Sequence, residues 1–165
     1  MKDVQDNSEG SKNRLGSSVP PFFSPIADLF SIDLRSLAFF RIGFGLVLLI
    51  DVLYRWKDIN FFYTDDGAFP RMEALRHLSP YSFCYHLAAG NWEFQALTFL
   101  IAAIAHLCFI FGYKTRLAAI LSWVHVLSID RRNYQVLQGG DDLIRNMAFW
   151  AMFLPLGARW SLDSL

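Results

Sequence analysis

Long apolar runs separated by short polar segments are the dominant pattern along the chain. The four main runs cover residues 37–54, 92–111, 117–129 and 143–156. Each is too continuous for a strand that buries only one face. As a helix rising ~1.5 Å per residue, the first run reaches ~27 Å, close to the hydrocarbon thickness of a bilayer. The pattern therefore predicts about four transmembrane helices and an all-α fold.

Helix-terminating residues give these runs their expected limits. Asn91 is placed to cap the second run, and Gly112 to end it. Thr115 is expected to cap the third run, which reaches only ~20 Å and must extend or carry its flanking side chains to the interface. Pro155 and Gly157 close the fourth run, which is also short.

The connection over residues 59–90 is expected to hold turns and short interfacial helices. Asp66-Gly67 indicates a tight turn, and Pro70 stops any helix that precedes it. Ser79-Pro80 is expected to start a short helix that Gly90 ends.

The N-terminal part has a different character. Residues 1–24 are mostly polar and cannot bury enough apolar surface to offset their ordering entropy, so we predict a disordered tail. Apolar residues at roughly helical spacing within 22–30 indicate a short amphipathic segment at the membrane surface, and Asp33 is a candidate N-cap. Residues 25–165 then form the transmembrane domain.

Composition supports a lipid environment. The chain is 54% hydrophobic and 18% charged, whereas soluble domains average about 25% charged residues. The formal net charge is zero, which argues against a nucleic-acid partner. We expect a multi-pass protein of the inner or plasma membrane whose partners are the lipid bilayer and further membrane helices or a partner chain. Lys114 and Arg116, in the tight link after the second run, favour a cytoplasmic link.

Ionisable side chains at membrane depth need a partner or a wet cavity. Arg41 and Asp51 lie ~15 Å apart along one helix and cannot pair with each other. Asp51 is expected to reach Arg55 one turn on, and Arg41 is expected to find an acceptor such as Asp141 or Asp142. Such pairs either fix the packing of the helices or form an anion-binding or proton-handling site.

His106 and His125 lie at similar heights on the helical hairpin formed by the second and third runs. Their offsets from the link correspond to ~9 and ~13.5 Å, so the two imidazoles lie within about one turn of each other. They either make separate interhelical hydrogen bonds or share a cavity, a proton path or a metal. A histidine pair without a nearby carboxylate or cysteine is weak evidence for a metal.

The segment 130–145 is the richest polar stretch in the transmembrane part. Gly139 and Gly140 precede Asp141 and Asp142 at a helix start, where aspartates ordinarily cap the helix. Metal binding jointly with Asp65 and Asp66 requires both loops on one membrane face, which the alternating topology provides, but we predict no metal site. Motifs for nucleotide binding, zinc proteases and serine hydrolases are absent from the sequence.

Five motifs occur in an order that resembles one family. They are residues 31–43 (SIDLRSLAFFRIG), 62–67 (FYTDDG) with Pro70-Arg71, 111–116 (FGYKTR), 139–145 (GGDDLIR) and 153–163 (FLPLGARWSLD). This arrangement is similar to the HTTM (horizontally transferred transmembrane) domain, the membrane module shared with vitamin K-dependent gamma-carboxylases. The resemblance implies a multi-helix membrane protein.

The resemblance also implies a candidate chemistry. In the carboxylases, oxidation of a hydroquinone by oxygen creates a strong base that removes a proton from a glutamate side chain, and carbon dioxide adds to the carbanion. The cofactor implied here is a reduced quinone such as vitamin K hydroquinone. The proposed catalytic lysine of the carboxylases follows an aspartate, and the matching position after Asp130 holds Arg131, a poor base.

Three hypotheses follow for function. The preferred one is a partial HTTM-type module without catalysis by itself, because the family continues through helices beyond the point that corresponds to Leu165. The second is a carboxylase-like, quinol-dependent enzyme, and the third is a transporter fragment built on short helices with polar mouths. The candidate site residues are Arg41, His106, His125, Arg131, Asp141 and Arg145.

Overall fold

The computed structural model describes residues 34–79, 82–158 and 160–164, and all regular structure in this part of the chain is helical. This confirms the all-α prediction. The α-helices are α2 (Leu34–Trp56), α3 (Ile59–Tyr63), α4 (Arg71–His77), α5 (Trp92–Phe111), α6 (Thr115–Arg132) and α7 (Gly139–Ala151). Three 3₁₀ turns are η1 (Tyr85–Leu87), η2 (Tyr134–Val136) and η3 (Leu162–Ser164). The predicted tail, the amphipathic segment at 22–30 and Asp33 lie outside the described residues.

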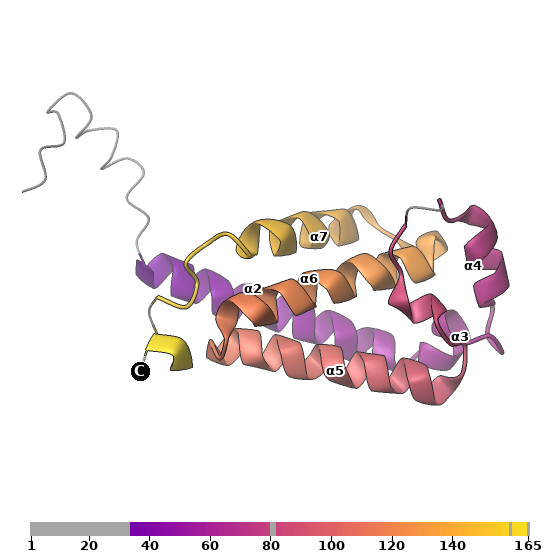
Figure 1. The fold of residues 1–165 in the computed structure, drawn as a ribbon, viewed down its shortest axis with the longest axis horizontal. Helices are drawn as coiled ribbons and strands as arrows, with labels where there is room; N and C mark the ends of the chain where they lie inside the picture. Colours follow the sequence, from indigo (N-terminus) through magenta and orange to yellow (C-terminus); the bar gives the residue numbers. More distant parts are fainter. Residues whose placement is uncertain (1–33, 80–81, 159, 165) are drawn as a thin grey trace, which may run out of the picture. The chain divides into compact units, whose positions relative to one another are not determined.

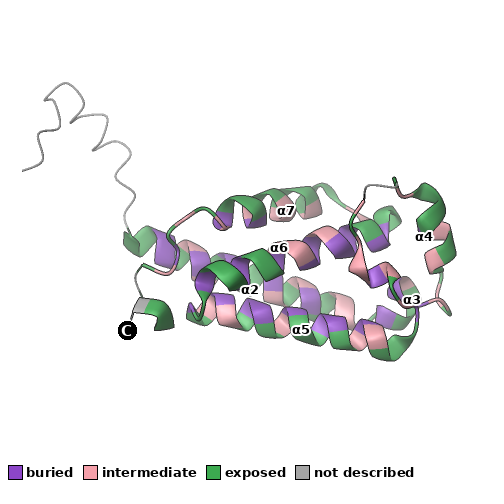
Figure 2. Cartoon of the chain, viewed as in Figure 1, coloured by how far each residue is buried: buried purple, intermediate pink, exposed green. Residues whose placement is uncertain are grey.

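Three long helices run side by side and form the body of the molecule (Figure 1). Helix α5 packs against α2 and against α6, and α7 packs against α6. The short helices α3 and α4 and the turn η1 gather at the end where α5 begins, and they contact α5 or α6. Buried residues follow the inward faces of the helices, while their outer faces are exposed (Figure 2).

The sequence locates α5 well, and the caps show why. Asn91 is its N-cap residue, although its side chain bonds to Glu93 rather than to the helix backbone. Gly112 ends the helix with a φ of 71°, a left-handed conformation that glycine adopts without steric cost. Helix α6 differs from the prediction, because Thr115 does not cap it. The carboxylate of Asp163 accepts the backbone N–H groups of Lys114 and Thr115 at 2.7 Å each.

The predicted count of about four membrane spans is not confirmed. Within the described residues, only α2 and α5 are long and apolar enough to cross a bilayer. Helix α6 extends past its apolar run to Arg132, as expected, but carries many polar residues. Helix α7 begins at Gly139 with a capping box between Gln138 and Asp141 and ends at Ala151, so its thirteen residues rise only ~20 Å.

Two apolar clusters lie along the bundle. One joins Phe44 and Leu48 of α2 to Phe109 of α5 and Val126 of α6, and the other packs Val52 and Phe99 around Tyr63. At Gly45, α2 packs closely against α5. A Cβ atom there would lie 2.6 Å from Cγ1 of Ile110, whereas a Cβ at Gly43 would meet nothing within 4 Å.

We predict that Gly45→Val destabilises the bundle and Gly43→Val does not. The added side chain at Gly45 must push α5 away, at a typical overpacking cost of about 1–3 kcal/mol. Thermal unfolding of the purified chain, followed by circular dichroism, measures the difference. Equal melting temperatures for the two variants would show that α2 and α5 do not touch at Gly45.

Candidate functional site

Three histidines form a row inside the bundle, and all three are buried. His125 of α6 lies in the middle, with its ring centroid 5.3 Å from that of His86 in η1 and 5.8 Å from that of His106 in α5. Both neighbouring rings meet His125 edge to face. The row therefore joins two long helices and the connection that precedes α5.

The hydrogen bonds of His86 fix its tautomer. The side-chain amide of Gln95 donates to the carbonyls of His86 and Ala89, so its oxygen faces Nδ1 of His86 at 2.8 Å. Nδ1 must then carry the proton, which leaves Nε2 as a lone pair. Burial lowers the pKa of His86 from 6.5 to about 4, so the ring stays neutral at physiological pH.

The other two histidines each meet a hydroxyl at Nδ1, and a hydroxyl can either donate or accept. That atom lies 2.7 Å from the hydroxyl of Tyr85 in His125 and 2.8 Å from the hydroxyl of Ser122 in His106. Burial raises the pKa of Tyr85, which keeps its hydroxyl protonated. Nε2 of each of the three rings is buried and has no hydrogen-bond partner among the described residues. The row thus holds three buried nitrogens whose bonding capacity is unused, a costly arrangement in an apolar interior.

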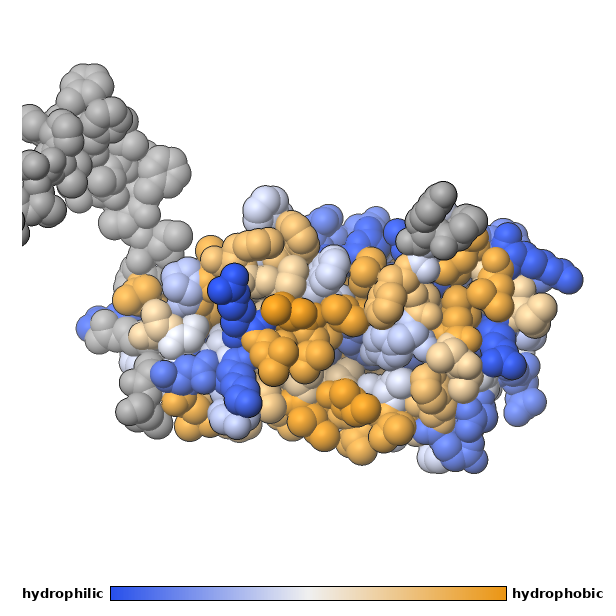
Figure 3. Space-filling model, viewed as in Figure 1, coloured by the Kyte–Doolittle hydropathy of each residue, from blue (hydrophilic) through white to orange (hydrophobic). Residues whose placement is uncertain are grey.

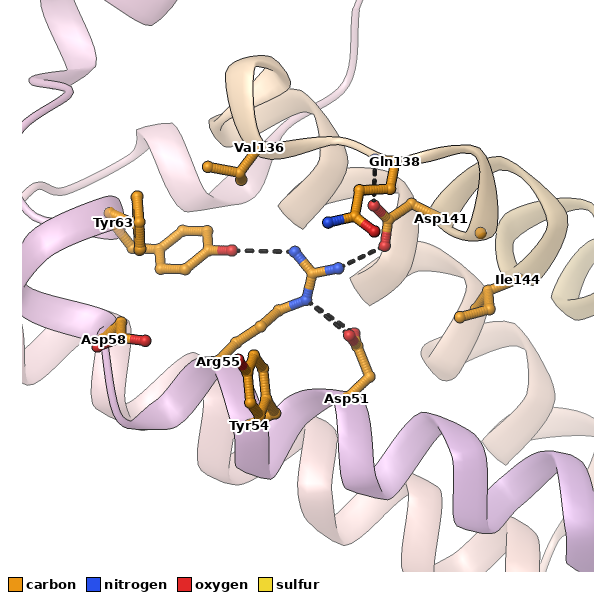
Figure 4. Close-up of a pocket in the computed structure, with 11 residues that line it drawn as sticks. Asp51, Tyr54, Arg55, Asp58, Tyr63, Val136, Gln138, Asp141 and Ile144 are labelled. Atoms are coloured by element: carbon orange, nitrogen blue, oxygen red, sulfur yellow. Dashed lines mark hydrogen bonds and ion pairs between the residues drawn. The ribbon is translucent and has the colours of Figure 1, made fainter.

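A pocket of about 340 Å³ opens at the end of the bundle that carries the loops after α2 and α6 (Figure 4). The Arg55 guanidinium reaches across it. It meets the carboxylates of Asp51 at 2.8 Å and Asp141 at 2.6 Å and donates to the Tyr63 hydroxyl at 3.1 Å. The predicted Asp51–Arg55 contact is therefore confirmed, while the link to Asp141 was not foreseen. This ion network ties α2 to the start of α7.

The predicted partners of Arg41 are wrong. Arg41 is fully buried at the opposite end of the bundle and donates to the backbone carbonyls of Leu156 and Trp160. Asp141 pairs with Arg55, and Asp142 pairs with Arg145. The sequence could not foresee this, because main-chain acceptors leave no trace in residue identity.

The charged residues of the two polar loops form ion pairs of their own rather than with the histidine row. Arg145 joins Asp130 to Asp142, and Asp65 pairs with Arg71. Across the described ranges, no group of three or more His, Cys, Asp or Glu side chains is arranged to hold a metal ion.

Arg131 and Arg132 have opposite surroundings. Arg131, at the position matched to the carboxylase lysine, is exposed on α6. Arg132 is fully buried and donates to the carbonyls of Phe69 and Tyr63 at 2.9 and 3.0 Å. Sequence reasoning missed Arg132, although its spacing of seven residues from His125 places both on one helix face. His86 was missed as well, since a loop histidine carries no periodic signal.

The arrangement supports base or ligand chemistry at the histidine row and a structural role for the arginine networks. A neutral imidazole with a bare Nε2 can accept a proton or a hydrogen bond. Family models, curated proteins and solved structures were compared with the chain, and none matches it. The geometry of the row and the distribution of apolar surface therefore carry the functional interpretation.

We predict that His86 makes folding sensitive to acid. Its pKa is about 4 in the folded chain and near 6.5 when unfolded, so the unfolded chain binds more protons between these values. The contribution of His86 to the free energy of unfolding is fully present above pH 6.5. It falls as the pH is lowered towards 4, by up to about 1.4 kcal/mol per pH unit.

His86→Asn keeps a donor for Gln95 but does not titrate, so its stability should fall less steeply over this range. Chemical unfolding at several pH values measures the difference between the two proteins. Parallel curves for wild type and variant from pH 7 to 4 would contradict the prediction.

Proposed function

We propose that this chain is the membrane-embedded helical module of a multi-pass protein, of HTTM type, with no catalysis by itself. The observation that carries the proposal is an inverted distribution of polarity. Large apolar side chains cover the outside of the long helices, and polar side chains fill part of the inside. Lipid as the solvent makes both choices favourable.

The outer faces of α2 and α5 support the proposal. Phe39 and Ile50 of α2 are 64% and 62% exposed, and Ile101 and Ile104 are exposed on α5. Only 39% of the apolar window in either helix is buried, whereas the core helix of a soluble protein would be mostly buried. Hydrophobic side chains spread over the middle of the visible face, with hydrophilic ones towards both ends (Figure 3). Monomeric soluble proteins rarely expose such continuous apolar surface.

The interior completes the contrast. Gln95, His106, Ser122 and His125 are all buried between the helices, and each makes a hydrogen bond to another polar group. Such contacts hold membrane helices together where the hydrophobic effect cannot. The order of the five sequence motifs supports the HTTM part of the proposal. A module of this type would pack against further helices or a partner chain.

We predict that membranes from cells expressing the full chain retain it during sodium carbonate extraction at pH 11 and release it in detergent. With Cys84 and Cys108 replaced by Ser, Asp66→Cys and Lys114→Cys should react with a membrane-impermeant maleimide from opposite sides. These exposed residues lie in connections at opposite ends of α5. Recovery in the carbonate supernatant, or labelling of both from one side, would refute the proposal.

The histidine row favours a second candidate, a quinol-dependent carboxylase-like enzyme. We infer that the row could accept a proton from a hydroquinone, because Nε2 of each ring has no partner within the described residues and that of His86 carries a lone pair. The exposed Arg131 in place of the lysine weakens this candidate. The candidate is kept because a bound quinol could supply the hydrogen bonds that the buried Nε2 atoms lack.

For this second candidate, we predict quinol-dependent oxygen consumption in membranes that falls at least tenfold in His125→Phe. His77→Phe, on the exposed surface of α4, is the matched control and should retain full activity. Asp141→Ala and Arg145→Ala test the polar loop in the same assay. Absence of quinol-dependent consumption, or equal rates in all variants, rules the enzyme out.

A further inference from the structure

An apolar groove of about 280 Å³ runs along the outside of the hairpin formed by α5 and α6. Ile104, Leu117 and Leu121 are exposed and form its walls, and the small side chains of Ala105 and Ala118 form its floor. The hollow exists because two alanines face each other between larger residues. One end of the groove reaches Tyr113 and Lys114 in the link between the helices.

Lys114 lines that end of the groove, and Arg116 lies two residues further on, in the first turn of α6, where it lines a separate hollow. Lys114 and Arg116 are both exposed, and within the described part of the chain neither forms an ion pair. The nearby carboxylate of Asp163 is engaged by the backbone N–H groups of Lys114 and Thr115 and by the Thr115 hydroxyl. The two side-chain charges therefore remain available to an external anion.

The opposite end of the bundle is different, because its carboxylates pair with most of its cations, although Lys57 and Arg131 form no ion pair within the described residues. Arg55, Arg71 and Arg145 each pair with at least one aspartate there. At the end that carries the α5–α6 link, Asp163 is the only acidic residue among those described. An anionic headgroup is thus attracted more strongly to one end of the molecule than to the other.

We propose that the α5–α6 groove binds an anionic glycerophospholipid, with an acyl chain along the groove and its phosphate beside Lys114, where the nearby charge of Arg116 adds to the attraction. This inference rests on the proposed membrane location and assigns a specific lipid site within it. The combination of an apolar groove with unpaired cations at one end matches the amphiphilic form of such a lipid. A zwitterionic lipid of equal chain length lacks the net charge that the two cations select.

The test uses the full chain purified in detergent and mixed with equimolar phosphatidylglycerol and phosphatidylcholine of the same chain length. Native mass spectrometry counts the lipids that the protein retains. We expect a preference for phosphatidylglycerol that falls about fivefold for each cation removed, in Lys114→Gln and Arg116→Gln. Lys57→Gln with Arg131→Gln, two exposed cations at the other end, is the control and should keep the preference.

A second pair of variants tests the groove itself. Ile104→Trp should fill the hollow and reduce retention of phosphatidylglycerol, whereas Leu97→Trp, exposed on α5 outside the groove, should leave it unchanged. Glycerol phosphate without acyl chains should fail to compete, which distinguishes a lipid from a free phosphate. Competition by glycerol phosphate would overturn the lipid assignment.

Equal retention of the two lipids by the wild type would overturn the inference, as would a preference that survives removal of both cations. These results differ from failure of the proposed membrane location. A chain that resists carbonate but shows no lipid preference refutes the lipid site alone. A chain that carbonate releases refutes the membrane location, and the lipid site with it.

Discussion

Two guanidinium groups buried at opposite ends of the bundle constrain the rest of the structure. Each donates hydrogen bonds to backbone carbonyls of a connecting segment, and Arg132 also lies 3.9 Å from the Asp65 carboxylate. Arg132 of α6 binds the carbonyls of Phe69 and Tyr63, and Arg41 of α2 binds those of Leu156 and Trp160. A buried charge is costly unless hydrogen bonds compensate it, so the connections that supply these carbonyls must stay in place.

The histidine row and the Arg55 pocket both depend on this anchoring. Tyr63 offers its carbonyl to Arg132 and its hydroxyl to Arg55, so one residue links the buried charge to the pocket. One turn of α6 before Arg132, the Ser128 hydroxyl accepts the backbone N–H of His86 and fixes η1 against the bundle. The same face of α6 thus positions both polar regions, and a shift of this helix would disturb them together.

The sequence predicts the positions of the helices better than the contacts between distant segments, for physical reasons. Asn91 and Gly112 locate α5 because caps are local, and Asp51 finds Arg55 because the two are one turn apart on one helix. The acceptors of Arg41 and the third histidine, His86, come from distant segments, and nothing local records those contacts. The fourth apolar run misplaces α7, because the capping box starts the helix at Gly139, before the run, and the helix ends at Ala151, before the run does.

The anchoring of Arg41 has a consequence for how the chain is made. Arg41 and its acceptors are 115 and 119 residues apart, and the acceptors are the later part. At a synthesis rate of roughly 5–20 residues per second, the Leu156 carbonyl leaves the ribosome about 6 to 23 s after the guanidinium. During that interval α2 cannot reach its final environment, and its placement is provisional. Among the long helices of the described residues, the first to be translated is therefore one of the last to reach its final position.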